Sequence, residues 1–476
     1  MARLPNPGSD ENARGILLNE FLRESHREDG KLKRTIEVFN VKDFGAIGDG
    51  QTDDTQAIQE AINAVDEPGR KSGLLFFPHG AYRANTLMIP TSIHGLTIFG
   101  SGRYGLSTSQ GTWIINMGAG PLFTTTGAGS LINFTVRDLS FTHTNRSGGN
   151  IFEPVNGPGF MKFEQVHFVL LNPNASFIKV AVGNPAHITL HEIRGYMARG
   201  AQVPAVDMAS ERHANLFGIE VANTMINADP TATAPIFRFE NGRGGGLAHG
   251  PIFRNVTLEA PGGGGIHLYS FTRTIFENVI AADLPAGGPG PSQPVIRIDK
   301  SSVEGSSTAR DVVIIGCFFA LGTPENPDIE IVDAIGQNGT VIIGSRVNQL
   351  KSISNSPLII GSRIVHLVGE TTPFWIDVGG RMLGVRSISQ TTTQAWNLRG
   401  SFTISGMNTV ATIALYPKET DTEYFLTVTP TTAVGNPATG SNRILSISKD
   451  TKSFAVQVEA APGKGNSVTF DWHLIR

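Results

Sequence analysis

The chain has few of the residues from which compact functional sites are often built. It holds one cysteine, Cys317, among 476 residues, which excludes an internal disulfide and any site with several cysteine ligands. The surrounding letters VVIIGCFFA predict that this cysteine is buried in the core. No histidine spacing fits a zinc site, and no GxxxxGKS or GxxxxGKT loop occurs, so we expect no bound metal and no cofactor.

Charge and long apolar runs are also scarce. Charged residues make up 17% of the chain, below the typical ~25%, and the net charge of −3 gives no basic surplus for a nucleic-acid partner. No run of eighteen apolar residues occurs, and the opening MARLPNPGSDENARG lacks a basic and apolar signal pattern. We therefore expect neither membrane insertion nor a classical signal peptide. Glycine is abundant, with 55 residues, which is typical of a β-rich, turn-rich protein.

The clearest local pattern lies in residues 38–65, which read VFNVKDFGAIGDGQTDDTQAIQEAINAV. A short strand leads to a glycine-punctuated loop, and Asp53 stands at the expected N-cap of a helix with Gln56 three residues further on. Helical periodicity near residues 53–66 is carried by Ala57, Ile58, Ala61, Ile62 and Val65. No later segment shows an equally clear helix, so the pattern predicts a helix that caps one open end of a β-structure.

This stretch carries a family resemblance. The letters DFGAIGDGQTDDTQAIQEAI, followed by LLFFPHGAY at residues 74–82, resemble the entry segment of the pectate-lyase-like superfamily of right-handed parallel β-helices. That superfamily includes polysaccharide lyases, glycoside hydrolases and bacteriophage tailspikes. The resemblance implies an all-β, right-handed, single-stranded parallel β-helix, and the aspartates in the matched stretch are interpreted as loop and cap residues rather than catalysts.

Strand-like segments then recur at the spacing of β-helix coils. One series, from VRDLSF at 136–141 to FENVIA at 276–281, places an apolar residue on each coil at Leu139, Val166, Ile193, Ile219, Val256 and Val279. A second series follows at intervals of 29, 31, 29, 30 and 33 residues and predicts an inward stack of Phe177, Val206, Phe237, Ile266, Ile296 and Ile329. After about residue 340 the rungs VIIGSRV and LIIGSRI are only 17 residues apart, which predicts a narrowing coil.

The outward positions of the second series form the candidate site, because side chains alternate along a strand. We predict Glu240, Asp207 and Asp299 as catalytic carboxyl groups, with Glu240 the central acid. Substrate-binding roles are predicted for Arg238, His267, Tyr269 and Arg297. Neighbouring parallel strands lie about 4.8 Å apart, so Glu240 would be roughly 8 Å from Asp207 and about 9.6 Å from Asp299, separations that suit inverting glycoside hydrolysis.

Two other interpretations of this face stay open. A lyase would use His267 or Tyr269 as the base that removes the proton next to a uronate carboxylate, with Arg238 or Arg297 neutralising that carboxylate. In the second interpretation, the face is a surface of cross-strand ion pairs without catalysis. Such a surface fits a fibre that binds a glycan without cutting it.

The two ends of the chain are predicted to be separate units. Residues 1–35 form a helical attachment segment that resembles the N-terminal segments of phage-tail proteins, residues 36–385 the β-helix, and residues 386–476 an antiparallel β-sandwich. The ending KSFAVQVEAAPGKGNSVTFDWHLIR resembles the C-terminal domains of tailspike-like proteins. The resemblance implies a homotrimer, with the N-terminal segment docked to a phage tail or another surface assembly.

The predicted function is that of a tailspike-like depolymerase that cleaves a bacterial surface polysaccharide. Hydrolysis is the favoured reaction, and elimination is the alternative. The predicted location is a virion, or the outside of a cell reached without a classical signal. A glycan-binding fibre without catalysis, or a structural spike with no glycan partner, remains an alternative.

Overall fold

The computed structural model describes residues 38–66, 71–103, 111–181, 185–209, 216, 218–241, 250–282, 291–299, 311–323, 326–332, 339–352, 357–368, 374–376, 399–414, 425–449 and 453–475. The predicted attachment segment at 1–35 and the predicted boundary between the β-helix and the β-sandwich, at residues 385–386, lie outside these ranges.

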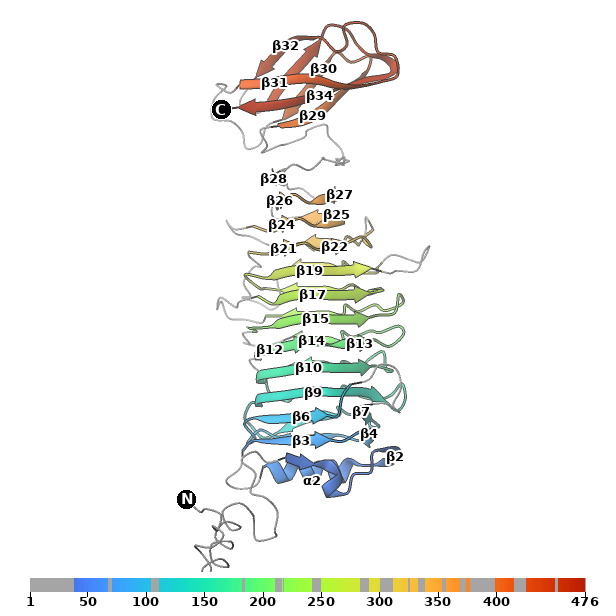
Figure 1. The fold of residues 1–476 in the computed structure, drawn as a ribbon, viewed down its shortest axis with the longest axis vertical. Coiled ribbons are helices and arrows are strands. Elements are labelled where there is room, and N and C mark those ends of the chain that lie inside the picture. The colour runs from blue at the N-terminus through green and yellow to red at the C-terminus, as the bar shows by residue number, and fades with distance from the viewer. Residues whose placement is uncertain are drawn as a thin grey trace, which may run out of the picture.

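The described chain is a right-handed parallel β-helix followed by antiparallel sheets, as the sequence predicts (Figure 1). Each coil contributes strands to three faces. The first face holds β1 (Val38–Asn40), β3 (Gly73–Phe77), β6 (Leu96–Gly100), β12 (Ala186–His191), β21 (Val313–Ile315), β24 (Val341–Ile343), β26 (Leu358–Ile360), β28 (Phe374–Ile376) and the first halves of β9 (Ile132–His143), β10 (Gly159–Val169), β15 (Glu220–Asn227), β17 (Ile252–Glu259) and β19 (Ile275–Ala282).

The second face continues these long strands around a corner. It holds their second halves together with β2 (Asp49–Asp53), β4 (Gly80–Ala84), β7 (Thr112–Asn116), β13 (Arg194–Tyr196), β22 (Phe318–Phe319), and the first parts of β25 (Arg346–Ser352) and β27 (Arg363–Val368). The third face holds β5 (Leu87–Pro90), β8 (Phe123–Thr126), β11 (Ile178–Val180), β14 (Val206–Ala209), β16 (Phe237–Glu240), β18 (Ile266–Tyr269), β20 (Ile296–Asp299) and β23 (Ile329–Ile331).

The corner between the first and second faces is set by residues with positive φ. They are Asp138, Gln165, Glu192, Asn223, Asn255 and Asn278, with φ between 51° and 59°. Asparagine tolerates this left-handed conformation better than most residues. The side-chain amide of Asn255 donates to Asn223 Oδ1 at 3.0 Å, and the side-chain amide of Asn278 donates to Asn255 Oδ1 at 2.9 Å. This side-chain ladder holds the bend in register over three coils.

Helix α2 (Thr55–Val65) closes one end of the stack, and its buried face comprises Ile58, Ala61, Ile62 and Val65. The predicted capping box is wrong in detail, because the N-cap position is held by Asp54, whose side chain makes no cap hydrogen bond, while Asp53 Oδ1 accepts from the Thr55 amide at 2.9 Å. The Asp54 carboxylate instead accepts hydrogen bonds from the Ile47 and Gly48 amides. The short strand predicted at the start of this stretch ends at Asn40, and the next residues form the 3-10 helix η1 (Val41–Phe44).

The inward ladders are largely confirmed, with two corrections. Val206, Phe237, Ile266, Ile296 and Ile329 pair in register and are all buried. At the first rung Ile178, rather than Phe177, pairs with Val206, because the amides of both residues donate to the Ala205 carbonyl and shift the register by one. In the other series, the prediction that Ile219 lies on the same rung as Val256 is wrong. Thr224 pairs with Val256 instead, and its side chain is buried.

The later coils narrow as predicted. Ile343 pairs with Ile360 across a single coil, and β25 pairs with both β22 and β23, so one strand serves two faces. Cys317 is buried with 2% of its surface exposed, which confirms its predicted core position. No helix in the described ranges is long and apolar enough to cross a membrane.

The C-terminal region forms two antiparallel sheets, β29-β34-β31 and β30-β33-β32. Their strands are β29 (Arg399–Gly406), β30 (Val410–Ala414), β31 (Phe425–Val434), β32 (Ile444–Lys449), β33 (Ser453–Val458) and β34 (Gly463–Ile475). Apolar side chains from both sheets pack between them, with the rings of Phe454 and Trp472 5.1 Å apart. This arrangement is the β-sandwich expected from the alternating strands.

Candidate functional site

The predicted site residues lie on the outer side of the third face, on four consecutive strands. We call Asp207, Arg238, Glu240, His267, Tyr269, Arg297 and Asp299 the third-face strip. The strands pair so that Asp207, Arg238, His267 and Arg297 form one column, while Glu240, Tyr269 and Asp299 form the next. The alternation of apolar and polar residues in FRFE, IHLY and IRID produces this arrangement, because every second side chain turns away from the core.

The first cluster in the strip is centred on Arg238. Its Nη2 lies 2.6 Å from Glu240 Oε2, and its Nη1 lies 3.8 Å from Asp207 Oδ1. Both carboxyl groups are largely covered, with 9% of the Glu240 side chain and 15% of the Asp207 side chain exposed. One guanidinium group therefore joins two carboxyl groups that come from adjacent coils.

A second cluster of the same kind is centred on Arg297. Its Nη2 lies 2.8 Å from Asp299 Oδ2, and its Nη1 lies 3.2 Å from Glu330 Oε2. Lys351 Nζ contacts the other oxygen of Glu330 at 2.7 Å. Asp299 and Glu330 are therefore both held in ion pairs.

Asp207 and Glu240 differ in how their charge is stabilised. Burial raises the pKa of the Asp207 carboxyl group, an effect that Arg238 and Lys179 partly oppose. Its Oδ1 is buried and accepts no hydrogen bond from the residues that the structure describes. Glu240, in contrast, receives a short hydrogen bond from a guanidinium group, which stabilises a charged carboxylate. The cluster thus pairs a carboxyl group whose pKa is raised by burial with one that accepts a short hydrogen bond from Arg238.

His267 occupies a buried position rather than an accessible one. Only 1% of its surface is exposed, and its Nε2–H donates to the Pro294 carbonyl at 2.8 Å. Burial lowers the pKa of the imidazole to about 4, so the ring is neutral near pH 7. In this structure the ring has no surface on which a sugar could stack, and its role is to separate the two arginine clusters.

Tyr269 stands between Glu240 and Asp299 in the second column and is partly exposed. Burial raises the pKa of its hydroxyl group, although Arg297 and Arg238 act in the opposite direction. Its position means that Glu240 and Asp299 are two strands apart with a phenol ring between them. Asp207 and Glu240 are the nearer pair of predicted catalytic groups.

Two contacts of this face are not apparent in the sequence. Lys351 reaches Glu330 only because the coil shortens near residue 340, which breaks the spacing of about thirty residues that revealed the other strands. The Pro294 carbonyl that binds His267 belongs to the turn before β20 and has no side-chain signal. The short coil could have indicated Lys351, since Glu330 pairs directly with it.

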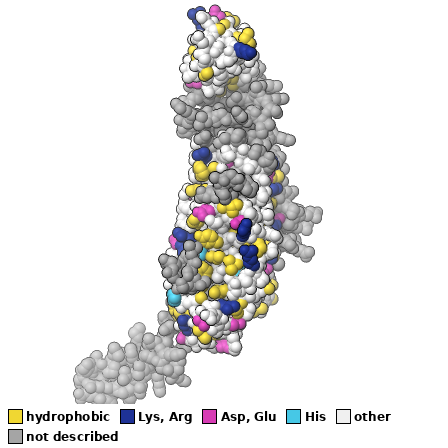
Figure 2. Space-filling view, turned by 90° about the vertical axis from the view of Figure 1, so that its right-hand side faces the viewer, with side chains coloured by type: hydrophobic (Ala, Val, Ile, Leu, Met, Phe, Trp, Pro, Cys, Tyr) yellow, Lys and Arg dark blue, Asp and Glu magenta, His cyan; other side chains and the backbone are white. Residues whose placement is uncertain are grey.

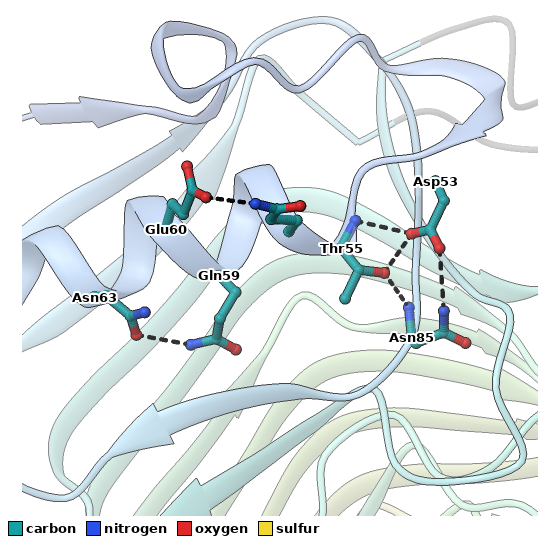
Figure 3. A pocket seen from close by; sticks show the side chains of 7 residues that line it. Asp53, Thr55, Gln59, Glu60, Asn63 and Asn85 are labelled. Carbon is teal, nitrogen blue, oxygen red and sulfur yellow. Dashed lines mark hydrogen bonds between the residues drawn. The ribbon is translucent and has the colours of Figure 1, made fainter.

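A separate shallow depression lies over α2, lined by Asp53, Thr55, Gln56, Gln59, Glu60, Asn63 and Asn85. Figure 3 shows that these side chains mostly bond to one another: Gln56 donates to Glu60, Gln59 donates to Asn63, and Asn85 contacts both Asp53 and Thr55. Their hydrogen bonds tie the start of α2 to the turn after β4. The depression is therefore interpreted as part of the cap.

Comparison with known proteins identifies the start of the solenoid. Residues 38–148 match the family model described as "Rhamnogalacturonase A/epimerase, pectate lyase-like". The matched segment is thus similar to pectate-lyase-like proteins. It contains α2 and the first coils, and the third-face strip lies outside it.

Individual relatives match only in part. Alginate lyase 7 of Azotobacter vinelandii is 55% identical over 47 residues, which are 10% of this chain and 5% of that protein. This chain thus spans only a small fraction of the length of this curated relative.

Among solved structures, the adhesin PfbA of Streptococcus pneumoniae has a TM-score of 0.49 at 12% identity, covering 72% of this chain and 93% of that chain. Tailspike gp49 of the Acinetobacter baumannii bacteriophage Fri1, a capsular polysaccharide depolymerase, has a TM-score of 0.44 at 10% identity, covering 93% and 87%.

Proposed function

We propose that this protein is a polysaccharide depolymerase that hydrolyses a bacterial surface polysaccharide at the third-face strip. The observation that carries the proposal is the pair of carboxyl groups joined by Arg238: Asp207 has a raised pKa and an unbonded oxygen, while Glu240 contacts the guanidinium group at 2.6 Å. Glycoside hydrolysis needs one protonated and one ionised carboxyl group. The pectate-lyase-like start of the chain and the partial identity to an alginate lyase support a polysaccharide as substrate.

We assign the roles of these two groups differently from the sequence-based prediction, in which Glu240 is the central acid. Asp207 is assigned as the general acid that protonates the glycosidic oxygen, because burial favours its protonated form. Glu240 is assigned as the base that removes a proton from the attacking water. Diagonal positions on adjacent strands place the two groups roughly 8 Å apart at the backbone, a separation that leaves room for the water of an inverting reaction.

Arg238 has a positioning role in this scheme. Its guanidinium group lies between the two carboxyl groups and keeps 39% of its side-chain surface exposed. It can therefore contact a sugar while it holds Glu240 in place. Asp299, tied to Arg297 two strands away from Glu240, is assigned to substrate contact together with Tyr269 and Arg297.

Elimination at the strip is less compatible with the same geometry. Of the two bases predicted for a lyase, His267 is buried with its Nε2 engaged by Pro294, and Tyr269 has a raised pKa that disfavours the phenolate. A proton-abstracting base must reach the substrate and be deprotonated at the working pH. Neither residue meets both conditions.

A glycan-binding fibre without catalysis is the second candidate, and one observation favours it. Each of the four strip-side carboxyl groups, Asp207, Glu240, Asp299 and Glu330, lies within 4.0 Å of an arginine nitrogen. Such arrays also stabilise β-surfaces without any chemistry. In that case the strip would bind a chain and leave its length unchanged.

The experiment that separates these functions is a screen against purified capsular and O-antigen polysaccharides, with mass spectrometry of the products. Hydrolysis predicts shorter chains that gain one water per cut. Elimination would give unsaturated ends that absorb in the ultraviolet, and a binding fibre would retain the polysaccharide without shortening it. Glu277→Gln is a matched control, because Glu277 forms a cross-strand pair with Arg254 on the first face.

We also propose that the protein acts as a homotrimer in a virion or on a cell surface, with residues 1–35 as its attachment segment. The C-terminal β-sandwich supports this proposal, because it offers a second unit through which chains could associate. Light scattering of the full chain tests it, and a monomeric mass would contradict it.

A further inference from the structure

A second group of chemically distinctive side chains lies on the outer side of the second face. Trp113, Ser140, His167 and Arg194 occupy successive positions of one column, because β7, β9, β10 and β13 pair in register there. Tyr196 stands in the neighbouring column of the same face. None of these residues belongs to the third-face strip. Figure 2 shows hydrophobic side chains on this side of the stack with Lys and Arg side chains among them.

Aromatic rings pack edge to face along this column. The Trp113 and His167 ring centroids are 5.4 Å apart at 80°, and those of His167 and Tyr196 are 5.9 Å apart at 90°. Trp113 and His167 are each 2% exposed, whereas Tyr196 is 39% exposed. The two buried rings therefore support a tyrosine whose ring presents surface to solvent.

Two arginines, Arg103 and Arg194, lie near these rings. Arg103, from the segment after β6, donates to the Glu192 carbonyl and lies 3.7 Å from the Glu192 carboxylate. Burial and the charge of the nearby Arg194 both lower the pKa of the Arg103 guanidinium group. Arg194 is exposed and forms no ion pair in the part of the chain that the structure describes. In contrast, Arg238 and Arg297 each contact two carboxylates.

Two buried polar atoms next to these cations also lack hydrogen-bond partners within the described ranges. They are Ser140 Oγ and His167 Nδ1, on residues that pair directly between β9 and β10. Buried polar groups are nearly always hydrogen-bonded, so two unbonded neighbours indicate a place where a polar atom from outside the chain belongs. The imidazole is neutral near pH 7, because burial lowers its pKa to about 4, and a neutral ring does not add to the charge of the two guanidinium groups.

We propose that Arg194, Arg103 and Tyr196 form a binding site for an acidic sugar unit of the uronate type. The sugar carboxylate binds Arg194 and Arg103, and a face of the sugar ring packs on Tyr196. Guanidinium groups recognise carboxylates through paired hydrogen bonds, and an exposed tyrosine supplies apolar area with a polar tip. His167 is a positioning residue that fixes the Tyr196 ring. The site shares its ligand class with the proposed function, and it does not depend on catalysis at the strip.

The test is equilibrium binding of oligomannuronate to the full chain by calorimetry, with malto-oligosaccharide of equal length as the neutral probe. We expect Arg194→Gln and Tyr196→Ala each to weaken oligomannuronate binding about tenfold or more. The first removes a charge-assisted hydrogen bond, and the second removes an aromatic contact. Arg254→Gln, which changes a paired arginine on the first face, is the matched control and should bind like the wild type. Glu240→Gln should also retain this affinity, even where it abolishes cleavage.

Each contrary result overturns the proposal. Wild-type protein that binds no oligomannuronate, or that binds the neutral probe equally well, shows that the site does not recognise acidic sugars. Equal affinities in the wild type, Arg194→Gln and Tyr196→Ala would place any binding elsewhere. If the Arg194 variant loses oligomannuronate binding and keeps cleavage, the proposed site is supported. If the Glu240 variant loses cleavage and keeps binding, the result concerns only the third-face strip.

Discussion

Arg238 Nη2 donates a hydrogen bond of 2.6 Å to Glu240 Oε2, across two positions of the same strand. The same guanidinium group approaches Asp207 on the preceding coil at 3.8 Å. These contacts give two carboxyl groups of similar chemistry different surroundings, because one accepts a short charge-assisted hydrogen bond and the other is mainly desolvated. The predictions about catalysis follow from this asymmetry.

The pH profile of cleavage should depend on Lys179. A general acid must be protonated, so activity should fall as the pH rises through the pKa of Asp207, which burial raises above 3.8. Lys179 lowers that pKa, and removing its charge should let the pKa rise further. Lys179→Gln should therefore move the alkaline limb of kcat to higher pH, while Lys162→Gln, which changes a lysine paired with Glu164, should not. A shift of the limb to lower pH in Lys179→Gln would contradict the assignment.

Stability should fall in acid partly because of His267. The imidazole has a folded pKa of about 4, below its ordinary 6.5. The folded state therefore binds fewer protons than the unfolded state between these values, so stability is complete above pH 6.5 and is lost as the pH falls toward 4. His267→Gln should reduce the loss of unfolding free energy between pH 7.5 and pH 4.5 by roughly 2–3 kcal/mol. Urea titrations at both pH values measure this, and equal losses in the two proteins would refute it.

The two adjacent aspartates before α2 should differ in their contribution to stability. Asp54 is 2% exposed and accepts hydrogen bonds from the Ile47 and Gly48 amides, whereas Asp53 lies at the surface. Asp54→Ala should cost about 1–3 kcal/mol, because it leaves two amides without partners. Asp53→Ala should cost less. Denaturant unfolding of the two variants provides the comparison, and a larger cost at Asp53 would restore the N-cap predicted from the sequence.

The asparagine ladder should require residues that accept positive φ. Asn255 has φ of 52° and bonds to the side chains of both Asn223 and Asn278. Asn255→Val should destabilise the protein by about 1–3 kcal/mol, since a β-branched residue is strained in this conformation. Asn255→Gly loses the side-chain bonds but not the conformation, so its melting temperature should fall less. Equal melting temperatures for the two variants would show that backbone strain is unimportant at this corner.

The sequence predicted the β-helix well because its signal is repeated. Each coil adds an apolar residue at nearly the same spacing, so Phe237, Ile266 and Ile296 could be aligned without a structure. The register failed where the local chain departs from the repeat. At Phe177 two consecutive amides bond to one carbonyl, and at Thr224 a polar residue occupies a position expected to be apolar.

The candidate site was predictable in position but not in electrostatics. Alternation along the strands was sufficient to place Asp207, Arg238 and Glu240 on one outer surface. It could not indicate that His267 is buried against the Pro294 carbonyl, because that contact depends on how a turn folds over the strand. The difference between Asp207 and Glu240 likewise depends on side-chain distances of a few ångströms, which strand spacing does not determine.

The most direct test of the central claim is the rate at which reducing ends are released from a polysaccharide that the wild type cleaves, compared among Asp207→Asn, Glu240→Gln and Asp299→Asn. Loss of an acid or base typically lowers the rate by about 10²–10⁴-fold. We predict a loss of that size for Asp207→Asn and Glu240→Gln, with a smaller loss for Asp299→Asn. Full activity in both the Asp207 and Glu240 variants would contradict the account.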